Sequence, residues 1–100
     1  MVTRLSVLLD KLIAAAPDAL LVVAKITPLS ANPTSLRDYN NLIPGLVQTR
    51  AAKGMHIILG DMNAGFTASN LASDGIHPNQ AGYNWMGDQW YALISSYLPK

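Results

Sequence analysis

Two short apolar runs constrain the fold of this 100-residue chain more than any other feature. The runs are ALLVVAKI, at residues 19–26, and MHIILG, at residues 55–60. Continuous apolar runs of this length, rich in β-branched side chains, are typical of strands buried on both faces of a parallel sheet. Segments with helical spacing of apolar residues flank them. The resulting order is helix, strand, helix, strand, long loop, helix, which predicts an α/β layer structure with parallel strands.

Three helices are predicted from the spacing of apolar residues. The first ends before Pro17 and has an apolar face made of Leu5, Leu8, Leu9, Leu12 and Ile13. The second covers about residues 35–53, where Pro44 is expected to interrupt or bend it and Gly54 to end it. The third begins near Asn79, after a stretch that is mostly loop at residues 61–78. Its predicted apolar stripe comprises Tyr83, Met86, Trp90, Leu93, Ile94 and Tyr97.

Two strands are too few for a stable α/β sheet. Either further strands come from another chain, or this sequence is part of a longer domain. We favour the second explanation and expect residues 1–100 to form a single partial domain, the C-terminal part of the whole. The sheet edge that this leaves exposed predicts self-association or aggregation.

Composition argues against several classes of function. The formal net charge is +1 and no basic patch stands out, so a nucleic-acid partner is not indicated. The longest apolar run, residues 19–24, is too short to span a bilayer, and the N-terminus does not resemble a signal peptide. Cysteine is absent, which excludes disulfides and thiolate metal sites.

The stretch SDGIHPNQAGY, at residues 73–83, places one of the two histidines of the chain three residues after an aspartate. A carboxylate beside an imidazole can fix its tautomer and stabilise its protonated form, as in a nucleophile–base–orienter set. Asp74 and His77 are therefore the candidate catalytic residues. The alternative is a loop turn followed by a helix cap, because Asp-x-x-His is a common pattern. His56, at the start of the second strand, is expected to be structural.

The segment DGIHPNQAGYNWMGDQWYALI resembles the last conserved block of the SGNH (GDSL-type) hydrolases, in which Asp-x-x-His-Pro precedes Gly-Tyr and an amphipathic helix. LLDKLIAAAPDALLVVAKITPL and YNNLIPGLVQTRAAKGMHIILGDM resemble the preceding helix–strand units of that family. The most similar subgroup is the acetylxylan-esterase-like carbohydrate esterases. The resemblance implies the C-terminal portion of a three-layer, flavodoxin-like SGNH hydrolase fold.

By this resemblance, His77 matches the general base of the family and Asp74 its acidic triad member. The implied reaction is removal of acetyl groups from a polysaccharide such as xylan, or hydrolysis of a small ester, without metal or organic cofactor. The resemblance implies a secreted parent enzyme, because such a polymer lies outside the cell.

The family's nucleophile block, a Gly-Asp-Ser-Leu-like segment, has no match in this sequence, and neither do its oxyanion-hole glycine and asparagine blocks. Gly60-Asp61-Met62 follows a strand but has methionine where a hydroxyl is required. Ser69 and Ser73 do not follow a strand-to-helix elbow. We therefore expect the chain alone to have little or no esterase activity.

The sequence is also compatible with two other functions. A strand followed by Gly-Asp-x-Asn resembles metal-dependent phosphodiesterases of the endonuclease/exonuclease/phosphatase type, in which Asp61 and Asn63 would act near a divalent cation. The chain could instead be a non-catalytic remnant that binds carbohydrate or a protein partner. Of its aromatic side chains, Tyr83 and Trp90 are expected in the core, and Trp85 and Tyr91 at its border or exposed.

Overall fold

The computed structural model describes residues 2–99, and its elements follow the predicted order. In chain order these elements are α1 (Val2–Ala15), β1 (Leu21–Ala24), α2 (Thr34–Ala51), β2 (Ile57–Gly60), the 3₁₀ turn η1 (Ala68–Asn70), α3 (Gln80–Ile94) and the 3₁₀ turn η2 (Ser95–Tyr97). Both strands are shorter than the apolar runs that predict them.

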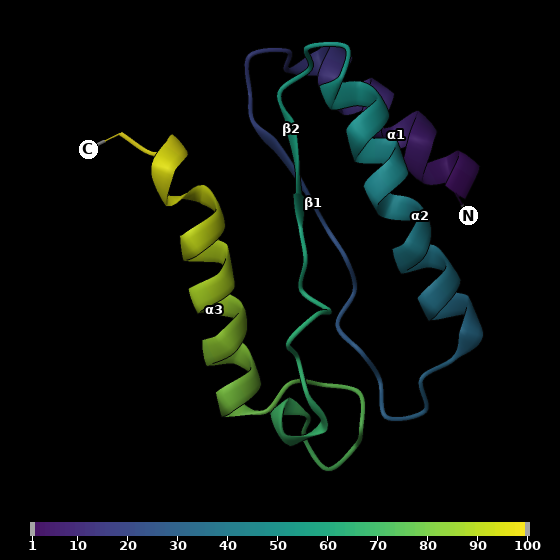
Figure 1. Ribbon diagram of the computed structural model, residues 1–100, viewed down its shortest axis with the longest axis vertical. Coiled ribbons are helices and arrows are strands. Elements are labelled where there is room, and N and C mark those ends of the chain that lie inside the picture. Colours follow the sequence, from purple (N-terminus) through teal and green to yellow (C-terminus); the bar gives the residue numbers. More distant parts are fainter. Residues whose placement is uncertain (1, 100) are drawn as a thin grey trace.

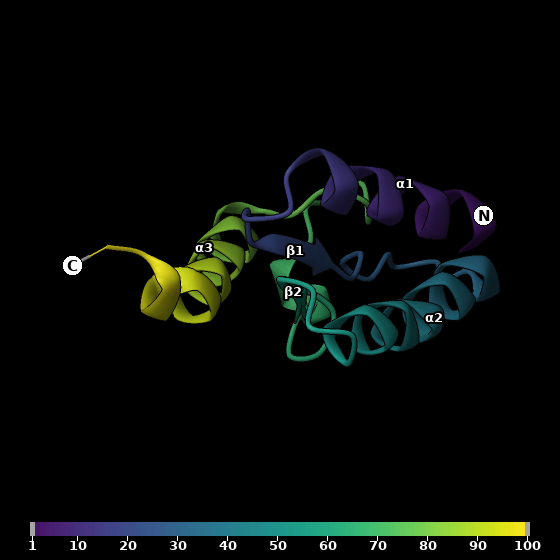
Figure 2. The same cartoon turned by 90° about the horizontal axis from the view of Figure 1, so that it is seen from above.

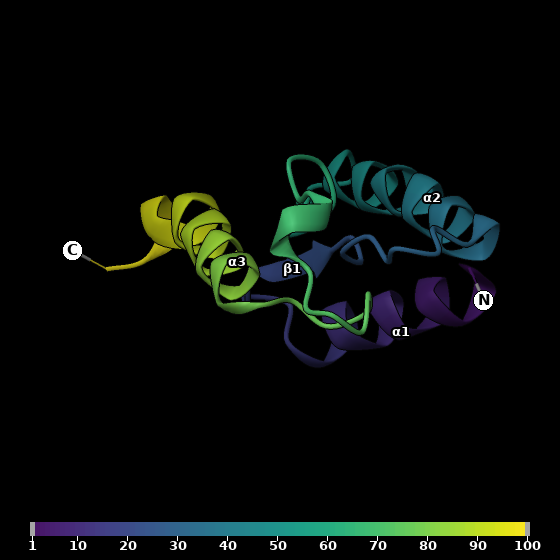
Figure 3. The same cartoon turned by 90° about the horizontal axis from the view of Figure 1, so that it is seen from below.

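The elements form three layers around a two-stranded parallel sheet. Leu21 lies opposite Ile57 and Ala24 opposite Gly60. α1 and α2 lie on one face of the sheet and α3 on the other, as the side view (Figure 1) and the views from above and below (Figures 2 and 3) agree. The predicted three-layer α/β arrangement with parallel strands is confirmed.

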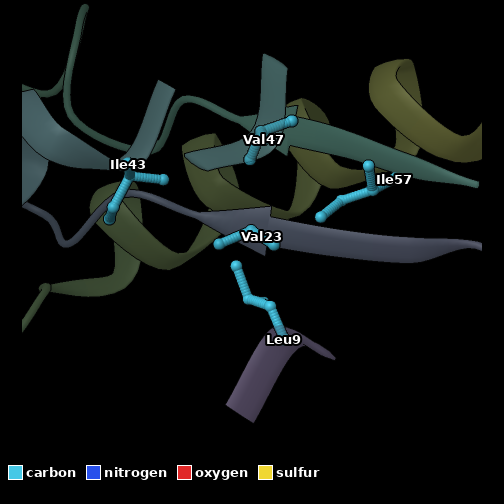
Figure 4. Close-up of a cluster of buried hydrophobic side chains, with 5 residues drawn as sticks. All are labelled: Leu9, Val23, Ile43, Val47 and Ile57. Carbon is cyan, nitrogen blue, oxygen red and sulfur yellow. The ribbon is translucent and has the colours of Figure 1, made fainter. Parts of the chain in front are cut away.

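The core lies between the sheet and the α1/α2 layer. Its five buried side chains come from four elements and converge on one another (Figure 4): Leu9, Val23, Ile43, Val47 and Ile57. Ile43, on α2, is 1% exposed. The sequence pattern predicts strands buried on both faces. In the structure only Val23 of β1 and Ile57 and Gly60 of β2 are buried, and the other strand residues are half-buried.

A buried arginine joins the two helices of this layer. The Nε atom of Arg50 on α2 donates to Asp10 Oδ1 on α1 at 2.9 Å. The Nη2 atom of Arg50 donates to the hydroxyl and to the carbonyl of Ser6 on α1, at 2.7 and 3.1 Å. The Nη1 atom of Arg50 donates to the carbonyl of Leu46 at 3.1 Å. Each of the three guanidinium nitrogens is therefore hydrogen-bonded, which makes its burial tolerable.

The helix α2 continues through Pro44 without a break, so the expected interruption is wrong. Proline removes one backbone N–H from the helical ladder. Ile43 and Val47, one turn apart on the same side, are both buried against the sheet. Their packing keeps this segment helical despite the lost hydrogen bond. Gly54, with φ of +86°, follows the helix as predicted.

Large parts of the predicted apolar faces are uncovered. Leu8 and Leu12 on α1 are 51% and 43% exposed, and Tyr83 on α3 is 54% exposed. The expectation that Tyr83 packs in the core is therefore wrong. The accessible surface is 6502 Å², against about 5,500 Å² for a typical monomer of 10.7 kDa. A sheet of two strands offers too little area to cover three amphipathic helices.

The outer edge of β1 is open among the described residues. The amides of Leu21 and Lys25 donate to the carbonyls of His56 and Gly60. Because parallel strands alternate their hydrogen-bonding direction, Val22 and Ala24 direct their backbone groups to the other side, away from β2.

None of the helices in residues 2–99 combines the length and apolar character needed to cross a bilayer.

Candidate active site

His77 and Asp74, the two residues singled out from the sequence, lie together on the loop before α3. The Nδ1 atom of His77 lies 2.6 Å from Asp74 Oδ2. The side chain of His77 is 70% exposed and that of Asp74 is 44% exposed. Nε2 of His77 has no hydrogen-bond partner among residues 2–99, so it can take a proton from an incoming hydroxyl.

Asp74 also shapes the turn that carries the histidine. Its other oxygen, Oδ1, accepts hydrogen bonds from the amides of Ile76 and His77, at 2.9 and 3.0 Å. Gly75, between them, has φ of +69°. A Cβ atom at this position would also collide with the hydroxyl of Ser30. The turn therefore requires glycine for both its backbone angle and its close neighbour.

A short frame of hydrogen bonds closes the loop. Leu71 forms an antiparallel bridge with Pro78, and the amide of Ala72 donates to the carbonyl of His77 at 2.8 Å. Asn79 caps α3 through its Oδ1 atom, which accepts from the amide of Gly82. Its Nδ2 atom donates back to the carbonyls of Ser69 and Leu71. One side chain thus fixes both the start of the helix and the end of the loop.

The carboxylate of Asp74 is held in its charged form. The hydrogen bond to the His77 side chain, followed by those from the amides of Ile76 and His77, lowers the pKa of Asp74 from 3.8 to about 2. The carboxylate is thus ionised throughout the neutral and mildly acidic range, and it can orient the ring and stabilise an imidazolium.

The pair lies at the end of the sheet where parallel α/β proteins collect their functional groups. β1 and β2 end at Ala24 and Gly60, and the segments that follow them meet at this loop. The amide of Ser30, in the loop after β1, donates to the carbonyl of Gly75 at 2.9 Å. The sequence carries no signal for Ser30, because no local pattern predicts a contact across 45 residues. His56 lies at the other end of β2.

Asp61 and Asn63, the candidate residues of the phosphodiesterase hypothesis, make structural contacts. Asp61 Oδ1 accepts from the amides of Asn63 and Ala64, both at 3.0 Å, and Lys25 Nζ lies 3.4 Å from Oδ2. Burial alone would raise the pKa of Asp61, but these three contacts outweigh it and lower the pKa below 3.8. The side chain of Asn63 donates to the carbonyl of Ile26.

No serine hydroxyl within residues 2–99 hydrogen-bonds to His77. The hydroxyl of Ser69 is 2.7 Å from that of Thr67, on the turn before the bridge. That neither Ser69 nor Ser73 is the nucleophile stays a prediction from the sequence. No group of three or more His, Asp or Glu side chains able to share a metal ion occurs in that same range.

The aromatic side chains of α3 divide between packing and exposure. Trp85 packs edge-on against Phe66, with ring centroids 5.6 Å apart and ring planes at 81°. Tyr91 is 71% exposed. Trp90 is half-buried.

A fold of this topology, with an Asp–His pair after its last strand, is typical of the SGNH class of hydrolases. The sequence model of the GDSL-like lipase/acylhydrolase family matches residues 2–90, so the chain belongs to this family. Among curated proteins it is 31% identical over 96 residues to a putative endoglucanase X of Acetivibrio thermocellus, covering 89% of this chain and 39% of that protein.

Three solved structures are similar to this one. A carbohydrate esterase family 3 protein from Talaromyces cellulolyticus has a TM-score of 0.81 and 31% identity, over 89% of this chain and 44% of that one. A family 3 carbohydrate esterase from Clostridium thermocellum has a TM-score of 0.83 and 29% identity, over 95% and 47%. A serine mutant of an acetyl esterase with acetate ion has a TM-score of 0.76 and 31% identity, over 90% and 46%.

These similarities confirm the family and the fold class predicted from the sequence. They give no support to the phosphodiesterase alternative or to a purely non-catalytic remnant. The chain spans less than half the length of each of these four proteins.

Proposed function

We propose that His77 is the general base of a serine esterase that removes acetyl groups from a polysaccharide such as xylan, and that Asp74 orients it. The observation that carries this proposal is the 2.6 Å contact between Asp74 Oδ2 and His77 Nδ1, with Nε2 left free on an exposed ring. The carbohydrate and acetyl esterases among the similar structures support the choice of substrate class.

In the proposed reaction, Nε2 of His77 takes the proton of a serine hydroxyl as the serine oxygen attacks the ester carbonyl. The tetrahedral adduct then collapses, and His77 returns the proton to the departing sugar hydroxyl. Water, deprotonated by the same imidazole, then attacks the acetyl-serine carbonyl. The bond between the acetyl group and the serine oxygen breaks, the imidazolium returns the proton to that oxygen, and acetate is released. Asp74 stabilises the imidazolium in both steps without itself taking up the proton.

The serine and the oxyanion donors are proposed to come from the part of the domain that precedes the matched region in the similar structures. Residues 1–100 cover only 44–47% of those chains. Each oxyanion donor accounts for about 10²–10³ in rate. On this proposal, residues 1–100 alone have little or no esterase activity.

The test is a chimera in which the unmatched N-terminal segment of the Clostridium thermocellum esterase precedes residues 1–100. We expect it to release acetate from acetylated xylo-oligosaccharides, with no effect of a metal chelator. His77→Ala should lower the rate by about 10²–10⁴, because the general base is lost. The matched control is His56→Ala, which removes the other histidine and should change little.

Two results would refute the proposal. The first is a chimera in which His77→Ala is as active as the parent. The second is activity that a chelator abolishes, since a serine esterase does not require a metal ion.

A further inference from the structure

A cavity of 560 Å³ adjoins the candidate active site, and the proposed chemistry does not use it. It lies at the carboxyl ends of the strands and is lined by side chains from residues 25–32, 36–41 and 63–71. Small-molecule sites usually have volumes of about 300–1,000 Å³. Apolar side chains such as Leu36 and Phe66 alternate in its wall with hydroxyl and amide groups, including those of Ser30 and Asn41. Such a mixed lining suits a sugar, which has apolar faces and hydroxyl edges.

The charge of this cavity is positive. Lys25 and Arg37 line it, and no acidic side chain does. Lys25 is paired with Asp61 at 3.4 Å. Arg37 donates to the hydroxyl of Thr34 at 3.2 Å and pairs with no carboxylate among the residues described. A guanidinium with free donors binds a carboxylate through two parallel hydrogen bonds.

The cavity and the loop that carries His77 share part of their walls. Ser30 lines the cavity, and its amide donates to the carbonyl of Gly75 at 2.9 Å. Leu71 also lines the cavity and forms the bridge with Pro78, the residue after His77. The cavity therefore borders the loop that carries His77, while the side chains of His77 and Asp74 lie outside its wall.

We propose that this cavity binds a sugar unit that bears a uronic acid, with Arg37 contacting its carboxylate and Ser30 and Asn41 its hydroxyls. This inference rests on the proposed function. That function has an acetylated polysaccharide as its substrate, and the inference adds that the polysaccharide carries acidic sugars. Lys25 adds to the positive field but is partly neutralised by Asp61.

The test is a binding titration of the full chain, followed by NMR, with three oligosaccharides of equal length. These are a xylo-oligosaccharide bearing one glucuronic acid, the same oligosaccharide without it, and an oligogalacturonate. We expect the acidic xylo-oligosaccharide to bind about tenfold more tightly than the neutral one, and 0.5 M salt to remove the difference. The oligogalacturonate shows whether the backbone or only the carboxylate is recognised.

The variants are Arg37→Gln and, as a matched control, Arg4→Gln, which removes an arginine of α1 outside the cavity. Arg37→Gln should bring the acidic oligosaccharide to the affinity of the neutral one, whereas Arg4→Gln should change neither. Arg37→Lys should retain part of the preference. Equal affinity for the acidic and neutral oligosaccharides, no binding of either, or unchanged binding by Arg37→Gln would overturn the inference.

This experiment is separable from the test of the proposed function. Binding should survive His77→Ala, because the imidazole is not part of the cavity wall. If the charged oligosaccharide binds through Arg37 but the chimera hydrolyses nothing, only the proposed reaction fails. If the chimera depends on His77 but shows no preference for the acidic substrate, only the inference on the cavity fails.

Discussion

At the scale of single residues, the site depends on the two carboxylate oxygens of Asp74, which have different hydrogen-bond partners. Oδ2 contacts the ring of His77, and Oδ1 holds the amides of the turn. A carboxylate that accepts three hydrogen bonds resists protonation. The turn and the candidate base are therefore coupled through one side chain.

The first prediction concerns the titration of Asp74. Its carboxyl carbon, followed by NMR, should titrate near pH 2 in the parent chain. In His77→Ala the pKa should rise toward 3.8, because the largest cause of the shift is removed while the two backbone bonds persist. The matched control is His56→Ala, which should leave the titration unchanged. A pKa near 3.8 in the parent chain would contradict the geometry.

The second prediction follows from the sign of this shift. The folded pKa lies below the unfolded value of 3.8, so ionised Asp74 stabilises the folded loop above about pH 4. That contribution should be lost as the pH falls from 3.8 toward 2. The stability difference between the parent chain and Asp74→Asn should therefore shrink over this range in urea unfolding. A difference that is constant with pH would show that the carboxylate does not contribute through its charge.

The third prediction concerns Asn40, a buried residue that ties α2 to the end of β1. Its Oδ1 accepts from the amide of Ile26 and its Nδ2 donates to the carbonyl of Ile26. Asn40→Ala should lower the free energy of unfolding by about 1–3 kcal/mol, since the backbone amide and carbonyl of Ile26 both lose a hydrogen bond to the buried Asn40 side chain. The control is the exposed neighbour, Asn41→Ala, which should change it by less than about 0.5 kcal/mol. Equal effects of the two variants would refute this role.

At the scale of elements, the junction between the loop and α3 is tightly packed at one glycine of the helix. Gly82 on α3 is buried, and a Cβ atom there would collide with the carbonyl of Asn70. Gly87, one and a half turns later, has open space beside it. The two glycines thus offer a matched pair within one helix.

The fourth prediction uses this pair. Gly82→Ala should destabilise the chain by about 1–3 kcal/mol, because the added methyl must push the helix from the loop. Gly87→Ala should stabilise it by about 0.5–1 kcal/mol, because alanine favours the helix. Thermal unfolding measures both. If both variants are stabilised, α3 does not pack on Asn70 as described.

The same elements show what the sequence could and could not predict. The helix–strand alternation, the parallel pairing and the placement of Asp74 beside His77 follow from local patterns of spacing and turn chemistry. The contact of Ser30 with Gly75 could not be predicted, because it joins loops after different strands. Tyr83 was placed wrongly because an apolar stripe predicts a buried face only when another layer covers it.

At the scale of the whole molecule, the chain is less compact and exposes more accessible surface than a typical domain of 100 residues. The radius of gyration is 14.8 Å, against about 13 Å for a compact domain of 100 residues. The outer edge of β1 is open, and Leu8 and Ile26 line a shallow groove beside its end. The partial domain itself stays a prediction from the sequence.

The fifth prediction is self-association through this edge and groove, with a second copy of the chain as the occupant. Sedimentation velocity should show a weight-average mass that rises with concentration. Leu8→Lys should weaken the association, because it places a charge in the groove. The control is Tyr91→Lys, which changes an exposed side chain of α3 on the opposite face. A chain that stays monomeric and unfolds with sharp cooperativity would contradict both this prediction and the partial-domain interpretation.

The central claim is that the free nitrogen of His77 acts as a base toward a hydroxyl that this segment does not supply. Chemical rescue tests it most directly, using the chimera described above with His77→Ala and acetylated xylo-oligosaccharide as substrate. The account predicts that added imidazole restores acetate release in the variant and leaves the parent chimera unchanged. Full activity of the variant without imidazole would contradict the account.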